Sequence, residues 1–238
     1  LMNWYKDMFF IKNSNLRKIN MNKLMTLVLA SLLSLGTFTA VNADGAIGVS
    51  MNKQAFGGFG KETNTTDVTE EYGAFADDNM SIFAEYGIGD SLSIGIEYHP
   101  GEISTPTNTN VKMAGSTGGT NAVTTGGTAK TNTVQADFED ITTIYLMWVS
   151  EIGLYSKVGY SHVDVATKES LGTGGSYGNV STDGATLALG FQKDNDSGIF
   201  ARVEVSATAW DSVSATNTAE STKKVEITDM ASASASIK

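Results

Sequence analysis

The sequence predicts an all-β protein, an eight-stranded antiparallel up-and-down transmembrane β-barrel, on three observations. Apolar and polar residues alternate with a period of two through most of residues 44–238. No amphipathic helix of useful length interrupts that alternation. The connections between alternating runs are short and long in strict turn, which is typical of a barrel in an outer membrane. A soluble sandwich has no reason to sort its loops in this way.

An apolar block precedes the alternating region. It covers residues 24–40, follows Lys23 and ends just before the small-residue site Val41-Asn42-Ala43. These are the parts of a secretory signal peptide, so we expect cleavage after Ala43. A membrane-spanning anchor is the alternative, but polar and small residues interrupt the run of about 20 apolar residues that a span needs.

The sequence therefore divides into three predicted parts. Residues 1–20 are interpreted as an upstream extension in front of the natural start at Met21, or alternatively as a long basic leader region. Residues 21–43 are the signal peptide, and residues 44–238 are the barrel. Residues 1–43 hold five of the 16 basic and one of the 26 acidic residues, which leaves residues 44–238 with a net charge of −14. So acidic a chain has no attraction for nucleic acid.

Eight alternating runs justify the strand count. The clearest pair meets at Gly89-Asp90, a tight turn that predicts a β-hairpin. The other short turns cover residues 150–152 and 193–197, and the absence of Cys excludes disulfides and thiolate metal sites. The predicted strands cover residues 45–57, 80–88, 91–99, 134–149, 153–166, 184–192, 198–210 and 224–238. The long connections, rich in Thr, Gly, Asn and Ser, cover residues 58–79, 100–133, 167–183 and 211–223.

The alternation predicts two faces for the barrel wall. Gly, Ser, Thr and Ala dominate the polar phase, and such small residues suit the narrow interior of an eight-stranded barrel. A soluble, lipocalin-like barrel, with its apolar phase turned inward, is the alternative that periodicity alone leaves open. The predicted lipid-facing set is Ile47, Val49, Met51, Ile82, Ala84, Tyr86, Ile94, Ile96, Leu187, Leu189, Phe191, Val203, Val205, Ala207, Ala231, Ala233, Ala235 and Ile237.

A few charged residues occupy the inner phase, and they are the candidate site. They are Glu85, Glu97, Lys157, Arg202 and Glu204. Charges inside a narrow barrel must be paired, because an unpaired buried charge costs several kcal/mol. The interpretation as a plug and the interpretation as a gate for ions use the same residues, and the narrowness of eight strands favours the plug.

Other chemistry has little support in the sequence. His99 falls in the inner phase at the predicted barrel mouth, where it could act as a base near Asp137 or Glu139, but no Ser-His-acid spacing indicates a triad. His162 shares the outward phase with Tyr160. The oxygen-rich stretches at 77–79 and 194–196 do not fit the Ca²⁺ loop pattern. We therefore expect no enzyme activity, cofactor or metal site.

The signal peptide, the alternating runs, the Gly-Asp turn and the segment from Leu154 to Tyr160 resemble small OmpA/OmpX-type outer-membrane barrels. The resemblance covers nearly all of residues 44–238, but it is one of pattern. It implies a Gram-negative outer membrane, lipopolysaccharide as the lipid neighbour, insertion by the barrel assembly machinery and a narrow or filled lumen. Such barrels usually end on an aromatic residue, whereas this sequence ends at Ile237-Lys238, so we expect that the last strand is cut short.

Three functions remain open from the sequence. The first is a structural and surface protein that displays its long loops. The second is a narrow, porin-like channel for ions or small solutes. The third is a lipid-modifying barrel enzyme that uses His99.

Overall fold

The computed structural model describes residues 45–64, 67–113, 129–172 and 175–238. The predicted upstream extension, the signal peptide and its cleavage site lie outside the described residues. Within the described part of the chain, no helix is long and apolar enough to cross a membrane.

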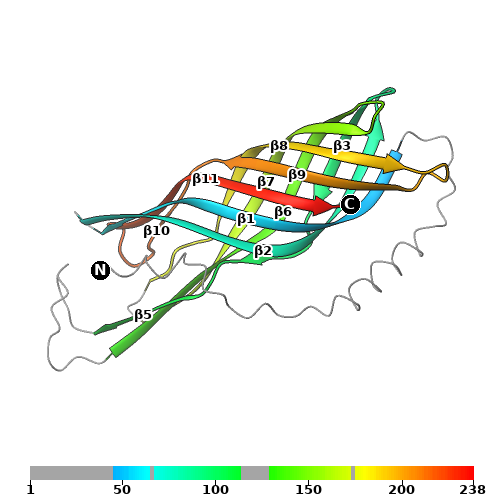
Figure 1. Cartoon of the computed structure of the whole chain (residues 1–238). Helices are drawn as coiled ribbons and strands as arrows, with labels where there is room; N and C mark the ends of the chain where they lie inside the picture. Colours follow the sequence, from blue (N-terminus) through cyan, green and yellow to red (C-terminus); the bar gives the residue numbers. More distant parts are fainter. Residues whose placement is uncertain (1–44, 65–66, 114–128, 173–174) are drawn as a thin grey trace, which may run out of the picture.

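The described residues form eleven strands in one sheet, and eight of them close into a ring (Figure 1). The ring order is β1-β2-β3-β6-β7-β8-β9-β11, and β11 pairs with β1. All of these pairings are antiparallel, which confirms the predicted eight-stranded barrel. The strands are β1 (Gly45–Asn64), β2 (Asp67–Gly87), β3 (Leu92–Tyr98), β4 (Ile103–Ser104), β5 (Asn108–Met113), β6 (Ala129–Val149), β7 (Leu154–Leu171), β8 (Val180–Asp194), β9 (Phe200–Trp210), β10 (Val213–Thr216) and β11 (Lys223–Ile237).

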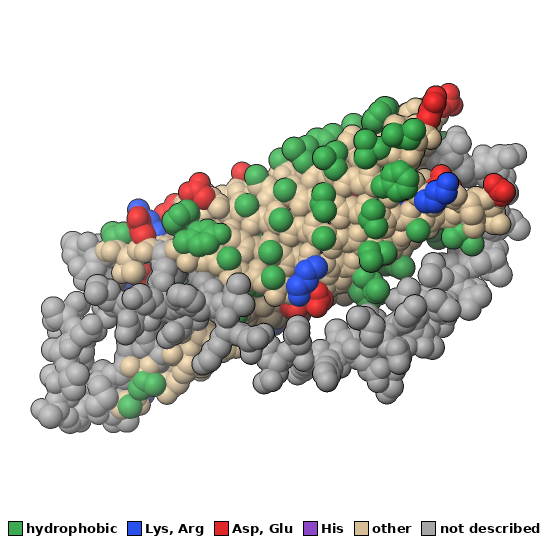
Figure 2. All heavy atoms as spheres, viewed as in Figure 1, with side chains coloured by type: hydrophobic (Ala, Val, Ile, Leu, Met, Phe, Trp, Pro, Cys, Tyr) green, Lys and Arg blue, Asp and Glu red, His purple; other side chains and the backbone are tan. Residues whose placement is uncertain are grey.

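The outward phase of the wall forms an apolar belt near the end of the barrel that carries the short turns, here called the inner end. Figure 2 shows hydrophobic side chains spread over the visible flank, with most acidic and basic side chains toward the two ends. Of the predicted outward set, every member but the half-buried Val49 is exposed. Further belt members are Leu92, Ile144, Leu146, Trp148, Leu154, Val158 and Tyr160.

The outward phase turns polar at a similar distance from the inner end on several strands. On β7 the apolar Val158 and Tyr160 give way to His162 and Asp164, and β8, β9 and β11 change in the same way. His162 Nδ1 lies 2.7 Å from a carboxylate oxygen of Asp183 on β8. We call this boundary the outer polar ring, composed of His162, Asp164, Asp183, Asp211 and Asp229.

The wall continues beyond that ring, so the predicted loop at residues 58–79 is wrong. The β1–β2 ladder runs without a break in register from Gly45 opposite Tyr86 to Asn64 opposite Asp67. The segment is rich in Gly, Thr and acidic residues, which is typical of loops. Its backbone groups are nevertheless paired, and its strands carry Phe56 and Phe75 into an apolar interior.

The other three predicted loops are also partly strand. Residues 100–133 contain β4, β5 and the start of β6, and β4 and β5 both pair with β6. Residues 167–183 contain the end of β7 and the start of β8, and residues 211–223 contain β10. Thr is common in these stretches, and as a β-branched residue it is favourable in strands as well as in polar connections.

The outer half of the barrel is filled by an apolar core, which the alternation in the sequence does not predict. Phe56 stacks on Phe75 with ring centroids 5.5 Å apart and lies 4.7 Å from the ring of Phe138. The other buried members of this cluster are Ile103, Ile141, Val163, Val165, Trp210, Val213 and Met230. The barrel therefore changes character along its axis, from a polar interior inside the apolar belt to an apolar interior beyond the polar ring.

Candidate functional site: the charged lumen

All five charged residues singled out in the sequence lie together inside the inner half of the barrel. Each is at least nine-tenths buried. They come from four strands, Glu85 from β2, Glu97 from β3, Lys157 from β7, and Arg202 and Glu204 from β9. Each side chain points inward because it occupies the phase opposite to the apolar belt.

A sixth member, Lys238, belongs to the same cluster. Its Nζ lies 2.5 Å from a carboxylate oxygen of Glu97 and 3.0 Å from one of Glu204, and its side chain is 1% exposed. We call these six residues the lumen charge cluster. With three acidic and three basic side chains, the cluster is formally neutral.

Most ion pairs of the cluster cross the lumen rather than join neighbouring strands. The Arg202 guanidinium donates two hydrogen bonds of 2.7 Å to the two carboxylate oxygens of Glu85, from β9 to β2. Lys157 Nζ lies 2.9 Å from Glu204 and 4.0 Å from Glu97. The bidentate arginine–carboxylate pair is the strongest geometry that such a pair can adopt.

Two tyrosine rings beside the lumen charge cluster lie over glycines of the next strand. Tyr145 faces Gly95 in register, and a Cβ added to Gly95 would be 2.5 Å from the Tyr145 ring. The same relation holds for Tyr155 over Gly190, at 2.3 Å. Glycine is required here because the interior is too narrow for both a ring and a Cβ.

These glycines allow the tyrosine hydroxyls to reach the buried acids. Tyr145 donates a hydrogen bond of 2.6 Å to Glu85, and Tyr155 donates one of 2.9 Å to Glu204. Lys157 Nζ also lies 4.2 Å from the centre of the Tyr145 ring, within the range of a cation–π contact. The acids are thus held by hydroxyl donors as well as by cations, which offsets the cost of burying them.

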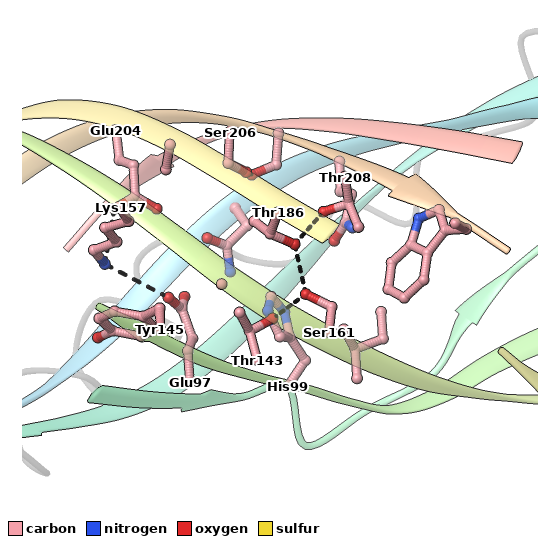
Figure 3. A pocket seen from close by; sticks show the side chains of 17 residues that line it. Glu97, His99, Thr143, Tyr145, Lys157, Ser161, Thr186, Glu204, Ser206 and Thr208 are labelled. Atoms are coloured by element: carbon pink, nitrogen blue, oxygen red, sulfur yellow. Dashed lines mark hydrogen bonds and ion pairs between the residues drawn. The ribbon is translucent and has the colours of Figure 1, made fainter. Parts of the chain in front are cut away.

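A small polar cavity separates the lumen charge cluster from the aromatic core (Figure 3). Its volume is about 50 Å³. Hydrogen-bonded hydroxyls run along one wall from Thr143 to Ser161 to Thr186 to Thr208. The cavity is large enough for a few water molecules and too small for an organic solute.

His99 lines this cavity, so it lies within the barrel rather than at the mouth that the sequence suggested. Its Nδ1 is 2.9 Å from the amide oxygen of Asn79. Asp137 and Glu139, the carboxylates considered as its partners, instead lie 3.1 and 3.6 Å from Lys168 Nζ. The extension of the wall explains the difference, since β1, β2, β6 and β7 all continue past the level of His99.

One acidic group was not anticipated. Carboxylate oxygens of Glu102, Asp137 and Glu139 lie within 4.8 Å of one another, a spacing compatible with a metal ion. The Lys168 ammonium already pairs with two of the three. The group is therefore best described as an ion-pair cluster on the outer half of the wall.

The sequence signals differ for the residues that were found and those that were missed. The five charges were detectable because isolated charges stand out in a phase of Gly, Ser and Thr. Lys238 gives no such signal, because it follows Ile237 in a strand whose pattern predicts that it continues. The roles of Tyr145 and Tyr155 can be recognised only when the register of the strands is known, because the register places each tyrosine opposite a glycine.

Comparisons with known proteins do not narrow the role of this chain. No protein-family model matches the sequence, and no curated protein matches it. The chain is similar in structure to Ail, the attachment invasion locus protein of Yersinia pestis, solved with the heparin analogue sucrose octasulfate. The identity is 11%, the coverage is 79% of this chain and 97% of Ail, and the TM-score is 0.28.

It is also similar to a FadL homologue of Pseudomonas aeruginosa, with 9% identity, a TM-score of 0.30, and coverage of 83% of this chain and 64% of that protein. At these identities and scores neither likeness bears on function.

Proposed function

We propose that this chain is an integral outer-membrane barrel with a structural and surface role, whose lumen is closed by the lumen charge cluster. One observation carries the proposal: the same strand segments present apolar side chains outward and buried charges inward. In water that arrangement would expose the apolar side chains to solvent, which is unfavourable. In a bilayer it is favourable, because neighbouring strands pair their backbone groups all the way round the closed ring and the belt presents apolar side chains to the lipid.

The proposed orientation follows from the two ends. The inner end carries the short turns and the end of β11, as periplasmic ends of such barrels do. The outer polar ring then marks the outer membrane surface, where its acidic side chains suit the divalent cations held by lipopolysaccharide. The wall beyond the ring projects from the cell. With this placement we propose lipopolysaccharide and the barrel assembly machinery as partners.

A closed lumen is favoured over the porin-like channel. The cation and acid side chains of the cluster pair across the lumen, and the aromatic core fills the barrel beyond the cavity. A hydrated ion would have to break these contacts in both zones in order to pass. The role of His99 as a catalytic base is disfavoured, since its ring faces an amide rather than a carboxylate.

Planar bilayer recordings test the proposal. The refolded protein, inserted from detergent, should produce no discrete ion-conducting steps. A variant with Glu85→Ala, Arg202→Ala, Phe56→Ala and Phe138→Ala weakens both closed zones without leaving a lone charge. It should conduct, which shows that the barrel inserts. Stable steps from the unaltered protein would contradict the plug and favour the porin-like channel.

A further inference from the structure

Lys238 is fixed in the barrel by its backbone as well as its side chain. Its N–H donates to the carbonyl oxygen of Arg202 at 3.0 Å, and the Arg202 N–H donates to the Lys238 carbonyl at 2.9 Å. This pairing extends the β9–β11 ladder by one step beyond Ile237 opposite Val203. The strand that closes the ring therefore delivers Lys238 into the lumen charge cluster.

The distribution of charge over the strands makes that delivery important. The three acids, Glu85, Glu97 and Glu204, lie on β2, β3 and β9, and two of the cations, Lys157 and Arg202, lie on β7 and β9. Without β11 in place, three acids would therefore face two cations.

Geometry shows which acids would be affected. Glu85 is satisfied by Arg202 and by Tyr145. Glu97 depends on Lys238, on Ser81 at 2.6 Å and on Lys157 at 4.0 Å. Lys157 lies closer to Glu204 than to Glu97. Glu97 is therefore the acid left without a close cation when Lys238 is absent.

From these contacts we propose that Lys238 is a closure lock: docking of β11 against β1 and β9 and neutralisation of Glu97 are one coupled event. The inference rests on the closed lumen proposed above. A partly closed barrel keeps an uncompensated acid in its interior, which is unfavourable in a low-dielectric surrounding. The ring is therefore most stable when β11 brings this cation to Glu97.

A double-mutant cycle tests the lock. Lys238→Met removes the cation at similar length, Glu97→Gln removes the acid but keeps an acceptor for Ser81, and the double variant removes both. The measurement is the midpoint temperature of the heat-induced gel-mobility shift of the refolded protein in detergent. The exposed pair Lys53 and Asp78, 3.0 Å apart, supplies the matched control as Lys53→Met, Asp78→Asn and their double variant.

Lys238→Met should lower the midpoint by roughly 10 °C. The double variant should recover at least half of that loss, whereas the control variants should change the midpoint by only about 2 °C. If Lys238→Met does not fold, folding of the double variant supports the lock, and failure of both overturns it. Additive losses in the cycle also overturn it.

Failure of this inference is separable from failure of the proposed function. If the mutational effects are additive while the protein inserts into bilayers without conducting, only the closure lock is refuted. If the unaltered protein conducts ions, the closed lumen is refuted, whatever the result of the double-mutant cycle.

Discussion

At the scale of single residues, the interior depends on glycines as much as on charges. The buried acids are reached by tyrosine hydroxyls only because each ring can lie over a glycine of the next strand. A lumen of eight strands has no spare volume, so a single added methyl group has a structural consequence.

Substitution of Gly190 measures this dependence. A Cβ in Gly190→Ala would be 2.3 Å from the Tyr155 ring and 2.5 Å from the Val203 carbonyl oxygen, so the ring must move away from Glu204. We expect a loss of about 2 kcal/mol in unfolding free energy, measured by urea titration of the refolded protein. Gly89→Ala is the control, because nothing lies within 4 Å of its added Cβ. Equal effects of the two changes would refute the packing argument.

A second residue-scale prediction concerns His162 in the outer polar ring. The hydrogen bond to Asp183 raises the pKa of His162, and the two neighbouring carboxylates act in the same direction. A raised pKa in the folded state means that the protonated form is favoured by folding. The stabilisation is therefore complete below the pKa of the unfolded state, near 6.5, and is lost as pH rises through the folded pKa.

The test compares the unaltered protein with His162→Gln at several pH values. The difference in unfolding midpoint should be largest near pH 6 and should shrink toward pH 8. Asp183→Asn should remove most of that pH dependence, because only Asp164 then remains beside the imidazole. A difference that stays constant over this range would show that the His162–Asp183 pair contributes no pH-dependent stability.

At the scale of elements, the largest difference from the sequence-based prediction is the extended β1–β2 hairpin. Phe59 and Tyr72 face each other on its outer surface, with ring centroids 5.3 Å apart, in a segment predicted as a loop. The paired backbone should protect these aromatic residues from proteases even though their side chains are exposed.

Limited proteolysis distinguishes the two descriptions. Chymotrypsin added to intact cells should not cleave after Phe59 or Tyr72, while the urea-unfolded protein is cut at both. Mass spectrometry of the fragments provides the readout. Rapid cleavage at either site in the folded protein would contradict the paired strands and favour the predicted loop.

The element-scale comparison shows what a sequence can and cannot specify. The inner hairpin at Gly89-Asp90 was predictable because a turn signal lies between two strictly alternating runs. The hairpin extension was not, since its Gly, Thr and acidic residues are compatible with either a loop or an exposed strand. What decides between them is pairing with β11 and the burial of Phe56 and Phe75, and both are long-range contacts. The bounds of strands therefore depend on tertiary structure more than their existence does.

At the scale of the whole molecule, the chain combines two barrels of opposite polarity on one set of strands. Near the inner end the outside is apolar and the inside is charged. Beyond the outer polar ring the inside is apolar, as in a water-soluble protein. The sequence predicted the eight strands of the ring, the outward phase and the five charged positions, because each is a local pattern. It did not predict the aromatic core or the part played by Lys238, because these arise only when distant strands meet.

The central claim is that the apolar belt faces lipid while the charged lumen is closed, and a cysteine scan tests it most directly. The chain has no natural Cys, so single cysteines can be placed along β8 and β9 without background. In lipid vesicles, Leu187→Cys, Leu189→Cys and Val205→Cys should resist a water-soluble maleimide, and spin labels attached to them should collide with oxygen dissolved in the bilayer. Asp196→Cys, in the inner turn, should react with the maleimide. Ready maleimide labelling of Leu187→Cys and Leu189→Cys in folded protein would contradict the membrane barrel and favour the soluble one.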